Sequence, residues 1–410
     1  MKLKFTTALV GATLIGLTPL AAFADGKDDD KKEIAIEIKQ LNTDTITSDL
    51  TVLIDGALSG KKDDDRNDDG RNRGGSGSQD VSETVMDALD AAAVAIGNSV
   101  SLEGVTAAGE LAKNSGDRDF SERGNKTPVV IPGAIEIEQT ATDDITASLD
   151  VEVKDIKIDD ALGGIDLSST AIGNTASLGT DTASISAGEL DLEQVFKGEK
   201  ITATADVEFD NVASELTTLT TAAIGNSANV VAEVGYKTDV DQTIGGERGE
   251  GAEISAILDF ITDADVKRIG TPSVLDASSV AIGNTFSAEL FEGFAADLSQ
   301  TVSSASKGGD YDDHDKRHGH DNDKLSAQIS SIATVETGSY ADVTVSSTAI
   351  GNAASFTGVD GGVGQAAKIE QDNYASVLAQ ADVKSFKPTT FSSTAAAIGN
   401  TATISISFVE

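Results

Sequence analysis

The sequence contains no cysteine and no tryptophan, and aromatic residues make up only 4% of it. Without cysteine the chain has neither disulfides nor a thiolate nucleophile, so burial and backbone pairing must hold its fold. The small aromatic content argues against a thick globular core built on large side chains. The apolar residues are mainly Ala, Val, Ile and Leu, mixed with Ser, Thr and Gly. This composition favours thin, regularly stacked β-layers, which are typical of chains with internal repeats.

Basic residues are scarce: 30 Lys and Arg stand against 68 Asp and Glu, which gives a formal net charge of −38. A chain this anionic is repelled by phosphate backbones and by anionic lipid surfaces, which argues against nucleic acid as a partner. Carboxylate-rich surfaces suit hard divalent cations, so calcium is the expected counter-ion.

Long hydrophobic runs are missing except at the start of the chain. Residues 1–24 combine Lys2 and Lys4 with an apolar stretch, Phe5–Leu20, and a small-x-small cleavage pattern at Ala22–Ala24. This arrangement predicts a secretory signal peptide. No later run reaches the roughly 18 apolar residues of a membrane-spanning helix. We therefore expect a secreted protein, extracellular or associated with the outer-membrane surface.

One motif, Ala-Ile-Gly-Asn, occurs six times at unequal intervals. The candidate site consists of the isoleucine and asparagine of each copy: Ile96 and Asn98, Ile172 and Asn174, Ile224 and Asn226, Ile282 and Asn284, Ile350 and Asn352, and Ile398 and Asn400. Taking every second residue places Ile172, Asn174, Ala176 and Leu178 on one side, which is typical of a half-buried strand.

This pattern predicts an asparagine ladder. A buried amide without a hydrogen bond costs about 1–3 kcal/mol, and stacking each asparagine on its equivalent in the next repeat provides that bond. The alternative is that Gly-Asn forms a tight turn. Both interpretations keep the chain rich in β-structure.

A second alternating segment, often ending in Asp-Val, recurs between the motif copies. Its copies are Ile145–Val153, Ile201–Phe209, Ile261–Val266, Tyr340–Val345 and Leu378–Phe386. Together these patterns predict an all-β fold, a repeat-built β-solenoid with disordered acidic inserts. The repeat region is expected over 134–410. Residues 25–133 are expected to be irregular, with residues 81–94 at helical spacing.

Two hydrophilic runs, 61–79 and 307–324, carry too little apolar surface to offset the entropy of ordering, and we expect them to be disordered. In the first, Asp65, Asn67 and Asp69 match the opening of a calcium loop. Its last position is Ser76 rather than glutamate, and no helices flank it. A solvated charge run is therefore favoured, with weak calcium binding at most.

Catalytic machinery is not recognisable. The chain has no cysteine, and all three of its histidines lie in the 307–324 run, so neither a serine nor a cysteine nucleophile has a plausible histidine base. No glycine-rich phosphate-binding loop follows a strand and opens a helix. We expect no enzymatic activity. A parallel β-helix polysaccharide lyase is kept as a minor alternative, because fold alone does not fix function.

The Gly-Asn-Ser/Thr-Ala motif, with Gln371–Gln380, resembles the repeats of curlin-type fibre subunits, which are secreted Gram-negative proteins that stack through Asn and Gln ladders. The signal peptide, length and spaced repeats are also similar to holdfast-anchor surface proteins of stalked bacteria. That resemblance implies export through a curli-type outer-membrane pore and a role in tying adhesive polysaccharide to the envelope. The match covers six short islands of the chain.

The sequence thus predicts a cell-surface structural or adhesive protein, a fibre subunit or an anchor for surface polysaccharide in biofilm or holdfast attachment. Its expected partners are further copies of itself or other fibre subunits, together with polysaccharide. The alternative is a calcium-stabilised monomeric adhesin or surface-layer component.

Overall fold

The computed structural model describes residues 4–9, 34–56, 84–105, 133–158, 164–180, 182–233, 237–245, 251–262, 273–291, 295–303, 327–338, 340–359, 366–386 and 388–407. Among these residues all regular structure is β-strand, and none forms a helix that could cross a membrane. The acidic runs 61–79 and 307–324, and the calcium-loop residues within the first of them, lie outside the described residues.

The described strands form three sheets, here named A, B and C. Sheet A contains β1 (Lys4–Leu9), β3 (Ile46–Asp55), β7 (Ile145–Ile158), β11 (Lys200–Ala213), β14 (Glu253–Thr262), β17 (Gln328–Thr337) and β20 (Ser376–Ser385), with β4 (Thr84–Met86) beside β7. Sheet B contains β2 (Ile34–Asn42), β6 (Ala134–Ala141), β10 (Glu189–Phe196), β13 (Lys237–Ile244), β16 (Ala295–Val302) and β19 (Ala366–Asn373). Sheet C contains β5 (Leu89–Leu102), β8 (Ile165–Leu178), β12 (Leu216–Glu233), β15 (Val274–Phe291), β18 (Asp342–Val359) and β21 (Thr390–Ser407), with β9 (Ile185–Ser186) beside β12.

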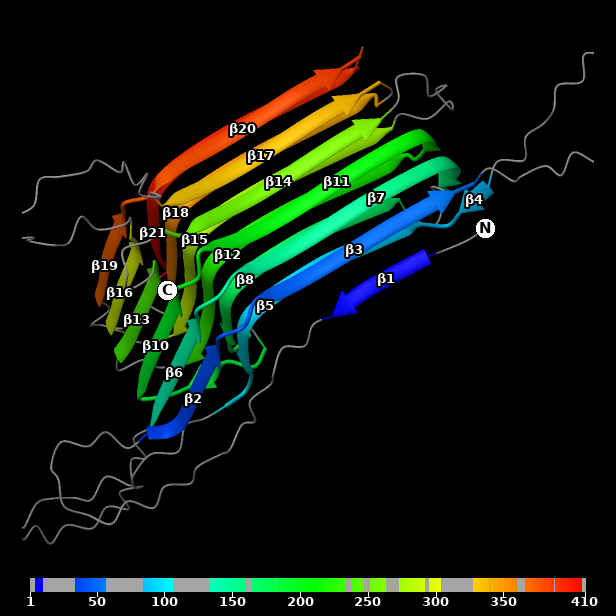
Figure 1. Cartoon of the computed structure of the whole chain (residues 1–410). Coiled ribbons are helices and arrows are strands. Elements are labelled where there is room, and N and C mark those ends of the chain that lie inside the picture. Colours follow the sequence, from blue (N-terminus) through cyan, green and yellow to red (C-terminus); the bar gives the residue numbers. More distant parts are fainter. Residues whose placement is uncertain are drawn as a thin grey trace, which may run out of the picture.

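The chain winds through the sheets in the order B, A, C, and each passage makes one coil (Figure 1). Six coils stack within the described residues, from coil 1 (β2, β3, β5) to coil 6 (β19, β20, β21). Apart from β1, which lies antiparallel to β3, neighbouring strands are parallel and in register. Equivalent residues of successive coils therefore form columns, the arrangement of a β-solenoid.

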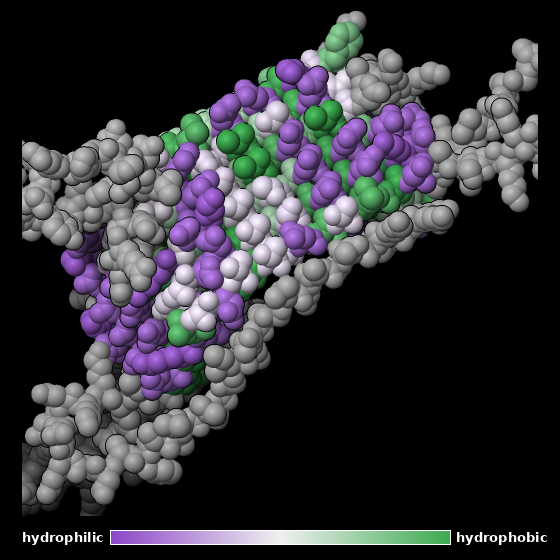
Figure 2. All heavy atoms as spheres, in the orientation of Figure 1, coloured by the Kyte–Doolittle hydropathy of each residue, from purple (hydrophilic) through white to green (hydrophobic). Residues whose placement is uncertain are grey.

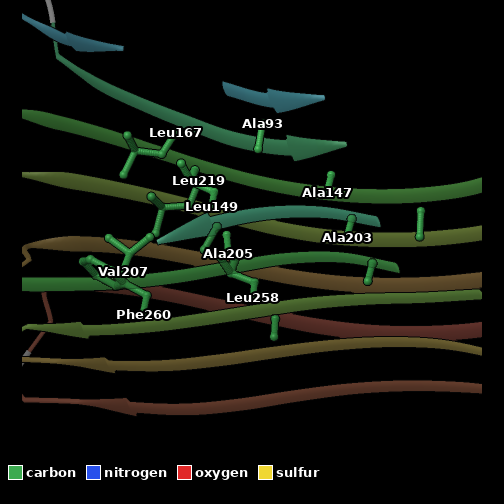
Figure 3. Packing of buried hydrophobic residues seen from close by; sticks show 14 of the residues in the cluster. Ala93, Ala147, Leu149, Leu167, Ala203, Ala205, Val207, Leu219, Leu258 and Phe260 are labelled. Atoms are coloured by element: carbon green, nitrogen blue, oxygen red, sulfur yellow. The ribbon is translucent and has the colours of Figure 1, made fainter. Parts of the chain in front are cut away.

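The core is divided into two clusters. One fills the space between sheet A and the first halves of the sheet C strands, and the other lies between sheet B and their second halves. Figure 3 shows the first cluster, in which Leu149, Ala205 and Leu258 follow one column of sheet A and Leu167 and Leu219 face them from sheet C. A single coil cannot bury its own apolar side chains, because their neighbours lie in the coils above and below. Stacking of coils therefore supplies the burial that stabilises each of them.

The N-terminal region differs from the prediction. Residues 25–133 were expected to be irregular, yet they contain the whole of coil 1, including the first motif copy. The helix predicted over 81–94 is wrong, because its described part forms β4 and β5. Leu89, Ala93 and Ala95 alternate toward the core, and pairing of β5 with β8 outweighs the local helical spacing.

Candidate functional site

The Gly-Asn pair is a corner of the coil. In β8, Leu167 and Ala171 face the core before Gly173, whereas Asn174 and Ala176 face it afterwards. The buried side of the strand thus changes at the glycine. The isoleucine and the asparagine on either side of it are paired with their equivalents in the next coil, but the glycine itself is not. One residue outside the alternation bends the strand as a β-bulge does, and it directs the two halves toward the two core clusters.

The isoleucines predicted to face inward beside the asparagines instead point to the outer face of sheet C. They form a column there, half-buried in coils 1 to 5, and Ile398 in coil 6 is 37% exposed. The prediction was wrong because it carried strict alternation through the corner. The residues concerned are Ile96, Ile172, Ile224, Ile282, Ile350 and Ile398.

The glycines of the corner are stacked so closely that a side chain does not fit. A Cβ added at Gly225 would lie 2.5 Å from the carbonyl oxygen of Gly283 in the next coil. At Gly97, Gly173, Gly283 and Gly351 it would approach the next carbonyl oxygen more closely still. At Gly399 in coil 6 its nearest neighbour would be Asn373 Nδ2 at 3.8 Å.

The six motif asparagines form one continuous ladder and lie within strands, not turns. In coils 1 to 5, Nδ2 donates to Oδ1 of the asparagine in the next coil, at 2.8, 2.8, 2.9, 2.9 and 2.9 Å in order. Asn174, Asn226, Asn284 and Asn352 are fully buried. This direction, donor toward the C-terminal coil, gives the ladder a polarity.

A second ladder, of glutamines, runs through sheet B. Each Nε2 donates to Oε1 of the glutamine in the preceding coil at 2.7–2.8 Å, so its polarity is opposite. Its members are Gln40, Gln139, Gln194, Gln242, Gln300 and Gln371. Sequence reasoning missed this set except for Gln371, although the dipeptide Gln-Thr recurs at three of its members, Gln139, Gln242 and Gln300.

The two ladders also join sheet B to sheet C. Gln194 donates to the backbone oxygen of Ser227 at 3.0 Å, and Asn174 donates to that of Val195 in the next coil at 3.0 Å. Equivalent bonds recur in other coils. Each inner amide therefore stabilises the stack along its column and closes the corner across it.

The outer faces of sheets A and B carry columns of acidic residues. In-register stacking aligns Asp150, Asp206 and Asp259 on sheet A, and Glu138, Glu193 and Asp241 on sheet B. Figure 2 shows that hydrophilic residues dominate the face over sheet B, while sheet A mixes both kinds. Burial and then the charge of Asp206 raise the pKa of Asp150 and of Asp259 above the ordinary value of 3.8. Burial, and then Glu138, Asp241 and Asp191, raise the pKa of Glu193.

Replacing Asp206 by asparagine should therefore stabilise the fold at pH 7, by about 0.5 kcal/mol, because like charges in adjacent strands repel. A carboxyl whose pKa is higher in the folded than in the unfolded state binds protons better when folded, so the wild-type protein gains stability as pH falls through that raised pKa. The difference between Asp206→Asn and wild type should shrink over the same range, as followed by thermal unfolding from pH 7 to 4. Asp276→Asn is the control, since Thr218 and Thr344 flank it in its column. An equal gain from both substitutions would contradict the repulsion.

Within the described part of the chain, no three His, Asp or Glu residues are placed to hold a metal ion. The candidate calcium ligands Asp65, Asn67 and Asp69 lie outside it. An open groove of about 620 Å³ lies at one end of sheet A, and Glu208, Lys384 and Phe386 are among its lining residues. Phe386 is 61% exposed.

Comparison with known proteins identifies a family. A family model described as HfaD, holdfast attachment protein D, matches residues 132–258 and 304–407, together more than half of the chain. No curated protein and no solved structure matches. The result supports the holdfast-type resemblance and does not support the curlin-type one. The chain belongs to the holdfast attachment protein D family, whose description points to adhesion at the cell surface.

Proposed function

We propose that this protein is a non-catalytic structural component that anchors a holdfast, an adhesive polysaccharide, to the outer surface of the cell. Its residues 1–24 would direct secretion, and a curli-type outer-membrane pore would complete its export. Its role would be mechanical: a stiff β-solenoid to which polysaccharide and surface fibres attach.

The observation that supports this role best is the pair of uninterrupted amide ladders, which run through all six described coils. An anchor must resist separation of its parts under load. Along the solenoid axis, every coil is joined to the next by backbone pairing in three sheets and by both ladders. Buried hydrogen bonds of this kind strengthen one another in a low-dielectric interior.

The outer faces offer surfaces for polysaccharide. The groove at the end of sheet A combines the exposed ring of Phe386 with the charged groups of Glu208 and Lys384. A sugar ring can pack its apolar face on an aromatic ring while its hydroxyls bond to neighbouring polar groups. Binding at this groove is part of the proposal.

Deleting the gene should leave holdfast polysaccharide synthesised but shed into the medium. Lectin labelling of cells and of cell-free medium measures the two fractions. An enzyme that makes or cuts the polysaccharide would instead change its total amount or chain length. Unchanged retention of the holdfast on cells that lack the protein would refute the anchoring role.

A second candidate, a calcium-stabilised monomeric adhesin, is favoured by the acidic columns and the raised carboxyl pKa values they produce. Under this alternative, calcium should raise the thermal midpoint well beyond sodium chloride of equal ionic strength. Equal effects of the two salts would indicate general screening only.

A further inference from the structure

Apart from β1, which lies along the outer edge of β3, no described strand covers either end of the solenoid. Repeat proteins usually carry terminal repeats with a polar outer surface, because unpaired strand edges and exposed core columns invite association. Here coils 1 and 6 continue the same columns as the inner coils. Ile404 of coil 6, which is 51% exposed, ends the column that Leu102 begins, and Phe391, also 51% exposed, ends the column of Leu89.

The amide ladders make these ends complementary. Asn98 begins its ladder with an Oδ1 to which no described group donates, and Asn400 ends it with an Nδ2 that makes one hydrogen bond instead of two. The glutamine ladder runs the opposite way, so Gln40 presents the spare donor and Gln371 the spare acceptor. A donor on each end therefore matches an acceptor on the other.

Asn400 shows what its end lacks. Each asparagine of coils 1 to 5 donates to a sheet B backbone oxygen in the following coil, as Asn352 does to Asp372 at 3.0 Å. Asn400 has no following coil within the described chain and donates instead to Gln371 of its own coil at 2.9 Å. In a further coil, the register would place the Leu41 oxygen of another copy in the position that Asp372 holds for Asn352.

Charges at the two ends also match. The column that begins at Glu37 is acidic in every inner coil and ends at Lys368. The neighbouring column begins at Lys39 and ends at Glu370. Coil 6 stacked on coil 1 of another copy would place Lys368 beside Glu37 and Glu370 beside Lys39, two opposite-charge pairs.

We infer that coil 6 of one molecule stacks on coil 1 of a second copy, in register, so that both amide ladders and all three sheets continue across the junction. The contact is heterologous and does not close on itself, so it generates a linear filament. Six coils spaced by about 4.8 Å give an axial repeat of roughly 29 Å per molecule. The inference rests on the proposed anchoring role and names the partner through which the anchor extends.

Strand β1 determines when one molecule can stack on another. It covers the outer edge of β3 in the antiparallel direction, where a parallel β20 of another copy would bind. The predicted cleavage after Ala24 would remove β1 and expose that edge. Filament growth therefore belongs to the processed chain, and a chain that keeps residues 1–24 should add to filaments more slowly.

The first experiment uses electron microscopy and sedimentation of the purified secreted protein over a concentration series, with Gly399→Ala as the variant. Among the described residues of its own molecule the added Cβ would contact only Asn373 Nδ2, at 3.8 Å, but it would meet the carbonyl oxygen of Gly97 in the next copy, as the Cβ would at the five other motif glycines. The expected result is filaments of wild-type protein, a rise of at least tenfold in the concentration needed to form them for Gly399→Ala, and an unchanged thermal midpoint. Wild-type protein that stays monomeric, or a variant that assembles equally well, would overturn the inference.

The second experiment keeps the inference testable if Gly399→Ala proves unstable. Lys368→Glu and Glu37→Lys each place like charges at a junction between identical copies, but a junction between the two variants restores opposite charges. Each variant alone should assemble less readily than wild type at low salt, and an equimolar mixture should recover. No recovery on mixing would contradict the proposed register.

These outcomes separate the inference from the proposed function. Cells expressing Gly399→Ala should shed part of their holdfast if anchoring needs the filament. Full retention by a variant that does not form filaments would overturn head-to-tail stacking as the anchoring device, while the anchoring role would stand. If the protein forms filaments but its deletion leaves the holdfast in place, the anchoring role would be refuted and head-to-tail stacking would stand.

Discussion

Gly225→Ala is expected to lower the free energy of unfolding by about 3 kcal/mol or more. The added Cβ would lie 2.5 Å from the carbonyl oxygen of Gly283 and would collide with the side chain of Ile244. The isoleucine can change rotamer. The carbonyl cannot move, because in-register pairing on both sides of the corner fixes the spacing of β12 and β15.

Gly399→Ala is the matched control for this effect, since it has the same sequence context and the same place in its coil. With only Asn373 Nδ2 at 3.8 Å, the same substitution should change the stability of the isolated molecule by less than about 0.5 kcal/mol. Chemical denaturation at a protein concentration below filament formation measures both. Equal losses would show that the glycine is needed for its backbone conformation and not for the close approach of coils.

At the Gly-Asn corner, the sequence alone predicts the buried asparagine. Period-two alternation, combined with the high cost of a buried amide, is sufficient to indicate stacked asparagines. The same alternation misplaced Ile172 and its equivalents, because the phase of a strand changes at a bulge and a local pattern carries no mark of that change. The stacking distance between glycines, which makes the bulge possible, is a property of two coils and not of one.

In the Asp-Val segments, sequence variation between coils obscures which residues are equivalent. The repeated Asp-Val pattern aligns Asp150 with Asp206 correctly, but the equivalent residues in the next two coils are Asp259 and Thr334, not the Asp-Val pairs within Ile261–Val266 and Tyr340–Val345. In coil 4 the valine is replaced by Phe260, and in coil 5 the aspartate is replaced. The column tolerates these changes because no side-chain hydrogen-bond ladder runs through it, whereas each ladder position needs one particular amide.

Asn226→Ala, the second large effect, should destabilise the protein by about 3 kcal/mol. The substitution leaves Oδ1 of Asn284 without the Asn226 amide that donates to it, deprives Asn174 Nδ2 of one acceptor, and frees the backbone oxygen of Thr243. A buried polar group deprived of its partner costs about 1–3 kcal/mol, and no solvent reaches this site to replace the lost bonds. Asn400→Ala, at the open end, should cost less than about 1 kcal/mol, because solvent can replace the bonds it loses.

Asn226→Asp distinguishes a directional ladder from simple filling of space. A carboxylate can accept from Asn174 but cannot donate to Asn284 Oδ1, so at pH 7 this nearly isosteric change should destabilise more than alanine does. Burial and the facing oxygen would raise the pKa of the new carboxyl, and its protonated form can donate to Asn284. The folded state then binds the proton better than the unfolded state, so stability relative to wild type should recover as pH falls through that raised pKa. A deficit that is independent of pH, or smaller than that of alanine, would mean that the amide nitrogen of this column does not carry the contact between coils.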